Sequence, residues 1–257
     1  MGKKRKSLGT VRWIILIVCA IVFCGCASYL GLYYKDIHEA QNGFEEVAEA
    51  VSDNGLEEAY EKNSDTIGWI KISGTKIDYP VMQTPDDPEY YLHRDFDKEK
   101  SDSGTPFMDA ASIVGAGDFG TENGGTWNWM IYGHHMKAGT MFGQLEKYQD
   151  KEFWQEHPEF EFDVILKSNM VIVENCRYEI FAAARSEIRS KDSSAFKYYQ
   201  YAGYTDKETF DEFVAGVKAE SLYNTGITPE YGDQLVTLST CAYHTDNGRF
   251  YVVGVAK

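Results

Sequence analysis

The sequence predicts a mainly β domain carried on a single N-terminal membrane helix. Three observations lead to this fold class. Twenty residues without a charge run from Trp13 to Leu32, eight short runs rich in β-branched and aromatic residues follow residue 66, and only two helical segments interrupt those runs. Many short strands with few helices favour a closed or nearly closed β-barrel. A chain of 257 residues is long enough to bury the core of such a domain.

The charge of the chain is distributed unevenly. The chain has 40 acidic and 25 basic side chains and a net charge of −15, and residues 1–12 contribute five basic side chains and no acid. The remaining residues therefore carry a net charge of −20. Binding to nucleic acid relies on Lys and Arg at the phosphates, so an acidic body of this kind argues against a nucleic-acid partner.

Residues 13–34 form the predicted membrane anchor. A helix of about twenty apolar residues crosses the hydrocarbon of a bilayer. The basic residues 1–12 precede this segment and the acidic body follows it. We therefore expect a single-pass protein of the cell membrane, with a cytoplasmic N-terminus and an extracellular body. A cleaved signal peptide is the alternative, but its apolar core is usually shorter, about 7–15 residues.

Residues 35–65 predict a helical stalk between the anchor and the main domain. Apolar residues recur there at steps of three and four, which is typical of one face of an amphipathic helix, at Ile37, Ala40, Phe44, Val47 and Val51. The residues Ser-Asp-Asn-Gly at 52–55 break the pattern, and a second short helix follows. We expect the apolar face of the stalk to pack on the main domain.

One domain is predicted over residues 66–257, because no domain-scale linker interrupts this part of the chain. Helices are expected at 141–157 and 206–221. Strands are expected in the β-rich runs, at 67–72, 76–82, 129–132, 160–166, 170–173, 178–184, 234–240 and 249–255.

Two cysteines lie outside the anchor, and their settings differ. Cys176 borders a strand-like run, where a buried and unreactive thiol is the common outcome. Cys241 follows the strand expected at 234–240, and the turn signal Asp-Asn-Gly at 246–248 leads into a strand that Arg249 opens. A hairpin would put Cys241 and Arg249 on one rim, where a guanidinium can stabilise a thiolate or an oxyanion. Taken alone, Arg249 would be an ordinary surface cation.

A histidine follows another strand of the predicted domain. The strand expected at 129–132 runs into Gly133 and His134, so this imidazole lies at a strand end that can face a cleft. A thiol becomes a better nucleophile when a neighbouring His shares its proton, so Cys, His and Arg at strand ends suit acyl transfer. His135 and His244 are rivals for this role. A Cys and two His could also bind zinc, but a fourth ligand at ordinary spacing is missing.

The residues around Cys241 belong to a wider set of motifs. Thr-Leu-Ser-Thr-Cys occupies 237–241 with Arg249 eight residues later, and Tyr-Gly-His-His-Met occupies 132–136. Further blocks lie at 91–96, 103–109, 139–145 and 148–153. Together these motifs, which span residues 66–257, resemble the sortases of class B, membrane-anchored cysteine transpeptidases of Gram-positive bacteria.

The resemblance implies a closed eight-stranded β-barrel with an added helix before the last strands, here at 206–221. Carried over residue by residue, it implies Cys241 as the nucleophile, His134 as the catalytic histidine and Arg249 as the essential arginine. It gives His135 no chemical role, and it implies neither a metal nor a cofactor. Contacts with the substrate are expected from three residues near the site, Leu92, Ser239 and Tyr243.

The implied reaction is a transpeptidation. The enzyme would cleave a C-terminal sorting motif after Thr in a secreted surface protein and hold the acyl group as a thioester, while Arg249 and the backbone N–H next to Cys241 bind the oxyanion. An amine of a peptidoglycan precursor or of a pilin lysine would then accept the acyl group. From the residues alone, two other classes stay open: another cysteine enzyme (papain-like, or an L,D-transpeptidase), and a tethered adhesin or sensor without enzymatic activity.

Overall fold

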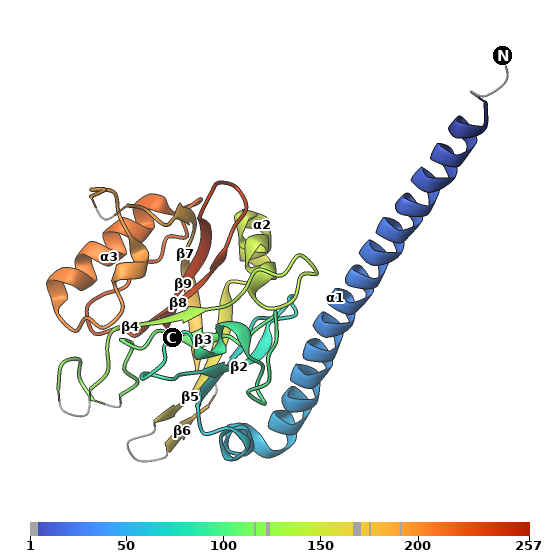
Figure 1. The fold of residues 1–257 in the computed structure, drawn as a ribbon. Coiled ribbons are helices and arrows are strands. Elements are labelled where there is room, and N and C mark those ends of the chain that lie inside the picture. Colours follow the sequence, from blue (N-terminus) through green and yellow to red (C-terminus); the bar gives the residue numbers. More distant parts are fainter. Residues whose placement is uncertain (1–4, 116, 122–123, 167–170, 175, 191) are drawn as a thin grey trace.

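The computed structural model describes residues 5–257 apart from 116, 122–123, 167–170, 175 and 191. Its main domain is a closed β-barrel of eight strands (Figure 1). The hydrogen-bonded order is β1-β2-β3-β4-β8-β9-β7-β5, and β5 pairs with β1 to close the ring. The strands are β1 Thr66–Lys71, β2 Asp78–Met82, β3 Phe107–Met108, β4 Asn128–Tyr132, β5 Glu159–Leu166, β7 Arg177–Glu187, β8 Leu235–Cys241 and β9 Gly248–Ala256. The predicted fold class is confirmed.

Each of the eight predicted strands coincides with a strand, but one of them lies outside the ring. β6, Val171–Val173, pairs only with β5 and extends the sheet beyond the closure, and residue 170 of the predicted run lies outside the described residues. The eighth strand of the ring is instead β3, which the sequence did not predict. β3 has two residues, which is too short for a period-two pattern to be recognised.

The seam between β1 and β5 requires a small residue. A Cβ placed on Gly68 would lie 2.3 Å from the carbonyl oxygen of Asp163 and 2.7 Å from the ring of Phe162. Both contacts are far shorter than real carbon contacts, so only glycine allows the two strands to approach and close the barrel here.

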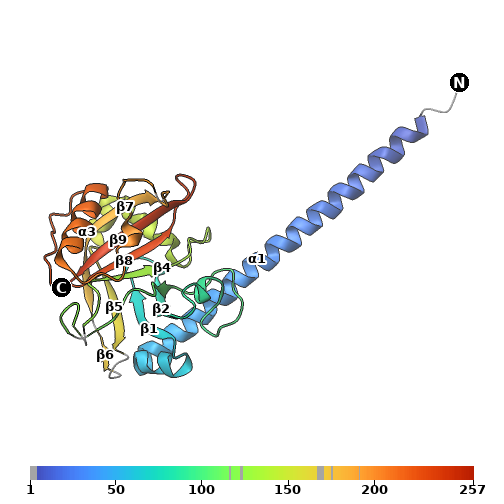
Figure 2. The ribbon, with the colours of Figure 1, turned by 60° about the vertical axis from the view of Figure 1, so that its left-hand side comes forward.

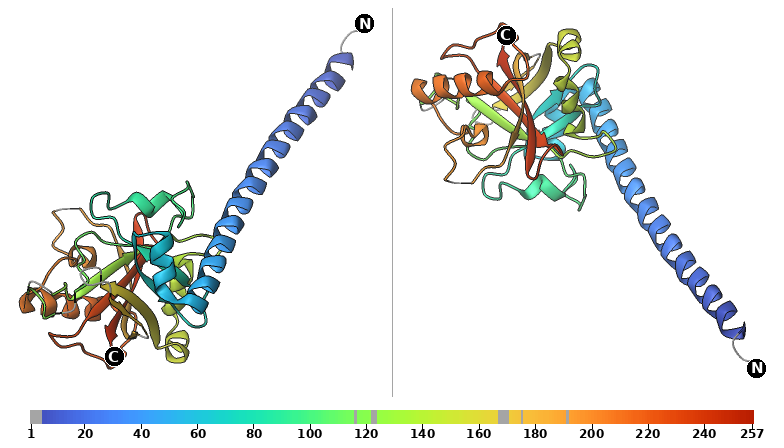
Figure 3. Two further views of the ribbon diagram at one scale, coloured as in Figure 1. Left: turned by 90° about the horizontal axis from the view of Figure 1, so that it is seen from below. Right: turned by 90° about the horizontal axis from the view of Figure 1, so that it is seen from above.

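Two hydrophobic clusters hold the domain together. The larger one joins buried residues of β1, β2, β4, β5, β8 and β9 with α1, and includes Ile70, Phe162 and Leu238. The second joins the barrel wall to α3, Lys207–Glu220, through Trp127 and Phe213. α3 confirms the helix predicted at 206–221, and it lies on the opposite side of the barrel from α1 (Figure 3).

The helix predicted at 141–157 is divided in two. A 3-10 helix, η2, covers Phe142–Gln149, and a short α-helix, α2, covers Lys151–Glu156. Asp150 separates them with an extended backbone, φ −91° and ψ 121°, and its carboxylate accepts a hydrogen bond from the Glu152 N–H. Asp150 therefore begins a new helix by capping it. Two further 3-10 helices, η1 (Tyr90–His93) and η3 (Tyr198–Gln200), lie in the connections.

The N-terminal helix α1, Arg5–Lys62, contains both the predicted anchor and the stalk. Residues 11–43 are long and apolar enough to cross a membrane, and this part of the helix extends away from the barrel (Figure 2). The helix kinks at Gly55, φ 78° and ψ 176°, as the break at 52–55 predicts. Ile37, Leu56 and Ala59 are buried against the domain. The other predicted stalk contacts, Ala40, Phe44, Val47 and Val51, have side chains outside the described part of the structure.

Candidate active site

A pocket of about 570 Å³ opens at the end of the barrel where β4 and β8 finish. Its wall contains Cys241, His134 and Arg249, the three residues whose types and strand-end positions predict acyl-transfer chemistry. The remaining wall comes from η1, β3, η3 and the loops beside them, and includes Glu89, Leu92, Phe107, Asp109, Tyr132, Ile188, Tyr198, Tyr199 and Ser239.

The β8–β9 hairpin brings Cys241 and Arg249 together. Cys241 is the last residue of β8 and pairs directly with Arg249 in the antiparallel register. Directly opposed residues of an antiparallel pair project from the same face of the sheet, with Cβ atoms about 5 Å apart. The thiol and the guanidinium therefore share one face of the hairpin, at the mouth of the pocket.

The guanidinium and the backbone around it are already hydrogen-bonded. Nη1 of Arg249 donates to the carbonyl oxygen of Gly248 at 2.9 Å. The N–H of Ala242, next to Cys241, donates to the same oxygen, also at 2.9 Å. This N–H was expected to bind an oxyanion, but its place in the hairpin turn commits it to Gly248. Among the described residues that line the pocket, Arg249 is the one whose side chain carries a fixed positive charge.

The parallel pairing of β4 and β8 brings His134 to the same place. The ladder ends with Tyr132 opposite Ser239, and the N–H of Gly133 continues it by donating to the Ser239 carbonyl at 3.1 Å. His134 and Cys241 each follow that last pair by two residues. Parallel strands advance in step about 4.8 Å apart, so two residues 107 positions apart in the chain become neighbours at one sheet edge.

The ring of His134 is held by two residues of η1. Its Nε2 lies 2.7 Å from the carbonyl oxygen of Leu92, and the ring stacks on His93 with 5.7 Å between centroids. A carbonyl oxygen only accepts hydrogen bonds, so Nε2 carries the proton in this contact. The other ring nitrogen, Nδ1, takes no part in this contact.

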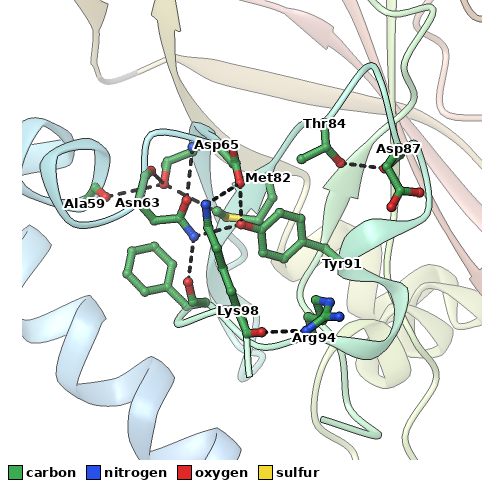
Figure 4. A network of polar contacts seen from close by, with 11 residues as sticks. Ala59, Asn63, Asp65, Met82, Thr84, Asp87, Tyr91, Arg94 and Lys98 are labelled. Atoms are coloured by element: carbon green, nitrogen blue, oxygen red, sulfur yellow. Dashed lines mark hydrogen bonds and ion pairs between the residues drawn. The ribbon is translucent and has the colours of Figure 1, made fainter. Parts of the chain in front are cut away.

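A polar network fixes the helix η1 that supplies the Leu92 carbonyl (Figure 4). The Tyr91 hydroxyl accepts a hydrogen bond from Asn63 Nδ2 and donates one to Asp65 Oδ2, both at 2.8 Å. Lys98 pairs with the same Asp65 oxygen at 2.9 Å. Burial raises the pKa of Tyr91, so its hydroxyl stays a donor at neutral pH. The network ties η1 to the junction between α1 and β1.

The two rival histidines lie elsewhere. Nδ1 of His135 is 2.8 Å from the carbonyl oxygen of Cys241 and does not face the pocket. His244 lies in the exposed tip of the β8–β9 hairpin. In the described part of the chain, no group of three His, Cys, Asp or Glu residues is arranged to hold a metal ion.

The three predicted substrate contacts have different positions. Leu92 and Ser239 line the pocket. Ser239 is almost completely buried, and its hydroxyl forms a 2.7 Å hydrogen bond with the hydroxyl of Tyr198. Tyr243 is 65% exposed, is not among the lining residues, and packs edge-on against His135.

Sequence reasoning missed several residues of the wall. Ile188, Tyr198 and Tyr199 come from the connection between β7 and α3, which has neither helical nor strand periodicity. Burial raises the pKa of Tyr198 and of Tyr132, and Asp109 adds to the rise for Tyr132, so both phenols are neutral at physiological pH. No signal in the sequence around Ile188, Tyr198 and Tyr199 pointed to the pocket.

Comparisons with known proteins identify the family of the chain. No family model matches the chain. Sortase B of Listeria monocytogenes is 32% identical over 201 residues, which cover 77% of this chain and 72% of the relative. Sortase B of Staphylococcus aureus is 30% identical over an alignment of 261 positions, which covers 97% of each chain.

The fold agrees as well. A sortase B–substrate complex from Staphylococcus aureus superposes with a TM-score of 0.69 at 24% identity, over 87% of this chain and 98% of the other. This likeness concerns the fold, whereas the sequence identities above establish the family. Neither a papain-like enzyme nor a non-enzymatic adhesin fits these findings. The chain belongs to the class B sortases and is a cysteine transpeptidase.

Proposed function

We propose that Cys241, His134 and Arg249 carry out the transpeptidation. The observation that supports this most strongly is the strand register, because β4, β8 and β9 bring these three residues to one pocket. The catalytic unit in this proposal is residues 66–257, carried by a stalk at 35–65 and an anchor at 13–34. β1 begins at Thr66, directly after the stalk, which supports the boundary.

The first half-reaction forms an acyl-enzyme. The thiolate of Cys241 attacks the carbonyl carbon of Thr in a C-terminal sorting motif of a secreted protein. Arg249 exchanges its bond with Gly248 for the oxyanion that forms. The C–N bond then breaks as His134, in its imidazolium form, protonates the departing amine. The product is a thioester between Sγ and the threonyl carbonyl.

The second half-reaction transfers the acyl group. An amine of a cell-wall peptide, or a pilin lysine, attacks the thioester carbonyl and gives its proton to His134. The S–C bond breaks, and the thiolate of Cys241 is regenerated. Offering a wall-peptide amine and a lysine-containing pilin peptide in one reaction, and measuring the two products by mass spectrometry, decides between the acceptors.

The acyl-enzyme is the direct test of these roles. The full chain in detergent is incubated with a peptide library in which Thr is fixed and the flanking positions vary, and its intact mass is measured. The wild type should gain the mass of the residues up to Thr. Cys241→Ala should form no adduct, and His134→Ala almost none. An adduct of equal yield in Cys241→Ala would contradict the assignment.

Cys176 offers a matched control for the thiol. Burial raises the pKa of Cys176, which disfavours its thiolate, and its thiol lies 3.5 Å from the carbonyl oxygen of Val173. Cys176→Ala should therefore leave the acyl-enzyme yield unchanged. A thiol-reactive probe at neutral pH should label Cys241 faster than Cys176, and equal rates at the two thiols would argue against an activated nucleophile.

We place the N-terminus in the cytoplasm and the barrel outside the cell membrane, with α1 crossing once. The apolar span at 11–43 supports a crossing, and the five basic residues within 1–12 support this orientation. Protease added to intact protoplasts should digest the barrel and leave a short membrane-bound fragment. Protection of the barrel until the membrane is permeabilised would reverse the orientation.

A further inference from the structure

His135 contacts the backbone of the nucleophile rather than its thiol. Its Nδ1 lies 2.8 Å from the carbonyl oxygen of Cys241, although 106 positions separate the two residues. The side chain of His135 is 12% exposed, and the carboxylate of Glu146 is 3.9 Å from the same nitrogen. Nothing in the chemistry proposed above uses this imidazole.

The geometry fixes the tautomer of this ring. A carbonyl oxygen has no proton to give, so the contact is a hydrogen bond only if Nδ1 of His135 carries the proton. The negative charge of the Glu146 carboxylate, 3.9 Å from Nδ1, favours the same arrangement. The neutral ring therefore has its proton on Nδ1, and the imidazolium form retains the same bond.

Two hydrogen bonds, one of them from His135, hold both ends of the peptide unit that joins Cys241 to Ala242. The carbonyl oxygen of Cys241 accepts from His135, and the N–H of Ala242, which belongs to the same peptide unit, donates to Gly248 at 2.9 Å. Rotation of this unit would break one bond or the other. This peptide unit is bonded to the Cα atom of Cys241, so its orientation determines the direction in which the Cys241 side chain leaves the backbone.

A neighbouring tyrosine supports the ring of His135. The Tyr243 ring packs edge-on against it with 5.0 Å between centroids, and the Tyr243 hydroxyl donates to the His135 carbonyl at 3.2 Å. The Thr240 hydroxyl adds a further link by donating to the Gly133 carbonyl at 2.7 Å. These contacts extend the β4–β8 ladder past its last pair, into the segments that carry His134 and Cys241.

We propose that His135 is a positioning residue for the transpeptidation: its Nδ1–H holds the Cys241 carbonyl and thereby keeps the thiol in register with His134. This inference rests on the proposed function. It differs from a catalytic role, because the imidazole of His135 reaches no reacting atom. Displacement of a reacting group by about 1 Å can lower a rate by about 100-fold, so the bond should affect turnover rather than substrate binding.

The test compares two amide substitutions that differ by one bond in length. Asn carries an N–H donor as many bonds from Cα as Nδ1 of His, whereas the donor of Gln lies one bond further out. His135→Asn should retain kcat within about threefold of the wild type. His135→Gln and His135→Ala should lose about 10- to 100-fold in kcat, with KM changed by less than about threefold. His157→Asn, the same substitution at a histidine away from the pocket, is the control.

The kinetic measurements on the His135 variants can refute the proposal in three ways. Activity of His135→Ala within twofold of the wild type would overturn it, as would equal losses in His135→Asn and His135→Gln, or a loss confined to KM. Thermal unfolding of each variant separates misfolding from mispositioning. If His135→Ala does not fold, the pair of amide variants still decides.

Two measurements do not need a sorting motif. Nitrogen-15 NMR of histidine-labelled wild type should give His135 a protonated, pyrrole-type Nδ1 resonance, and a proton on Nε2 in the neutral ring would overturn the proposal. Alkylation of Cys241 by iodoacetamide should be slower in His135→Gln than in His135→Asn, and equal rates would count against it. If the wild type forms no acyl-enzyme with any peptide, the proposed function fails. The NMR and alkylation measurements then still test whether His135 holds the Cys241 backbone and whether this bond affects the thiol.

Discussion

The hydrogen bond between Ser239 and Tyr198 in the pocket wall should be measurable as a coupling free energy. Both side chains are almost fully buried, and their hydroxyl oxygens are 2.7 Å apart. Removing one hydroxyl, in Ser239→Ala or Tyr198→Phe, leaves the other buried without this bond, which costs about 1–3 kcal/mol of unfolding free energy. For a domain of this size, each kcal/mol lowers Tm by about 2–4 °C.

The double substitution should cost less than the sum of the two single ones. Removing both hydroxyls leaves no stranded polar group, so the remaining cost is the net value of one hydrogen bond, about 0.5–1.5 kcal/mol. The coupling free energy should therefore be at least about 0.5 kcal/mol. Thermal unfolding of the full chain in detergent, followed by near-UV circular dichroism, measures the four proteins of the cycle.

Exposed positions provide the controls for this cycle. Ser190→Ala and Tyr204→Phe remove the same groups at residues that are exposed, and each should change Tm by less than about 1 °C. Additive losses in the Ser239 and Tyr198 pair, with a coupling free energy near zero, would refute the reasoning that the two hydroxyls satisfy each other.

Three further predictions concern the reactive side chains and the elements near them. Arg249→Lys should lower kcat/KM by about 100-fold or more, because an ammonium cannot reproduce the forked donors of a guanidinium, whereas equal activity would remove Arg249 from the proposed oxyanion site. Gly133→Ala should lower the unfolding free energy by about 1–3 kcal/mol and reduce acylation, because a Cβ there would lie 2.6 Å from the buried ring of Phe142; an unchanged Tm would show that the ring moves freely. Hydrogen bonds from Thr209 hold the pKa of Asp206 below its usual value of 3.8, so its carboxylate stabilises α3 fully above pH 3.8 and loses this effect as the pH falls through its lower folded value. The Tm difference between wild type and Asp206→Ala should thus be larger at pH 7 than at pH 3, and a difference that grows on acidification would reverse the assignment.

The strands other than β3 were predictable because each has a local pattern in the sequence. The pairing between distant strands was not predictable. The turn Asp-Asn-Gly links β8 to β9 through neighbouring residues, so the proximity of Cys241 and Arg249 follows from the sequence. The parallel pairing of β4 with β8 joins residues more than 100 positions apart, and no local pattern encodes its register. The proximity of His134 to Cys241 was therefore an expectation from the family resemblance, and the fold supplies its geometry.

The limits of sequence reasoning are clearest at neighbouring residues. His134 and His135 follow the same strand, and their types alone cannot say which ring faces the pocket. The contacts that distinguish the two rings come from residues distant in the sequence. The Leu92 carbonyl binds the ring of His134, and the Cys241 carbonyl binds the ring of His135. The position of Tyr198 in the pocket wall was not predicted for a related reason. Its helix η3 is three residues long, too short for a periodic pattern, and Tyr198 stacks on Tyr251, which is distant in the sequence.

The central claim is that the strand register brings a thiol, an imidazole and a guanidinium to one reacting carbonyl. A crystal structure of the wild type trapped as a thioester with a threonyl peptide analogue would measure it. We predict a covalent bond at Cys241, a ring nitrogen of His134 within about 3.5 Å of the reacting centre, and a guanidinium nitrogen of Arg249 at about 2.7–3.1 Å from the carbonyl oxygen. A bound peptide with its carbonyl on the far side of the pocket from Arg249, or with the His134 ring turned away towards solvent, would contradict the account.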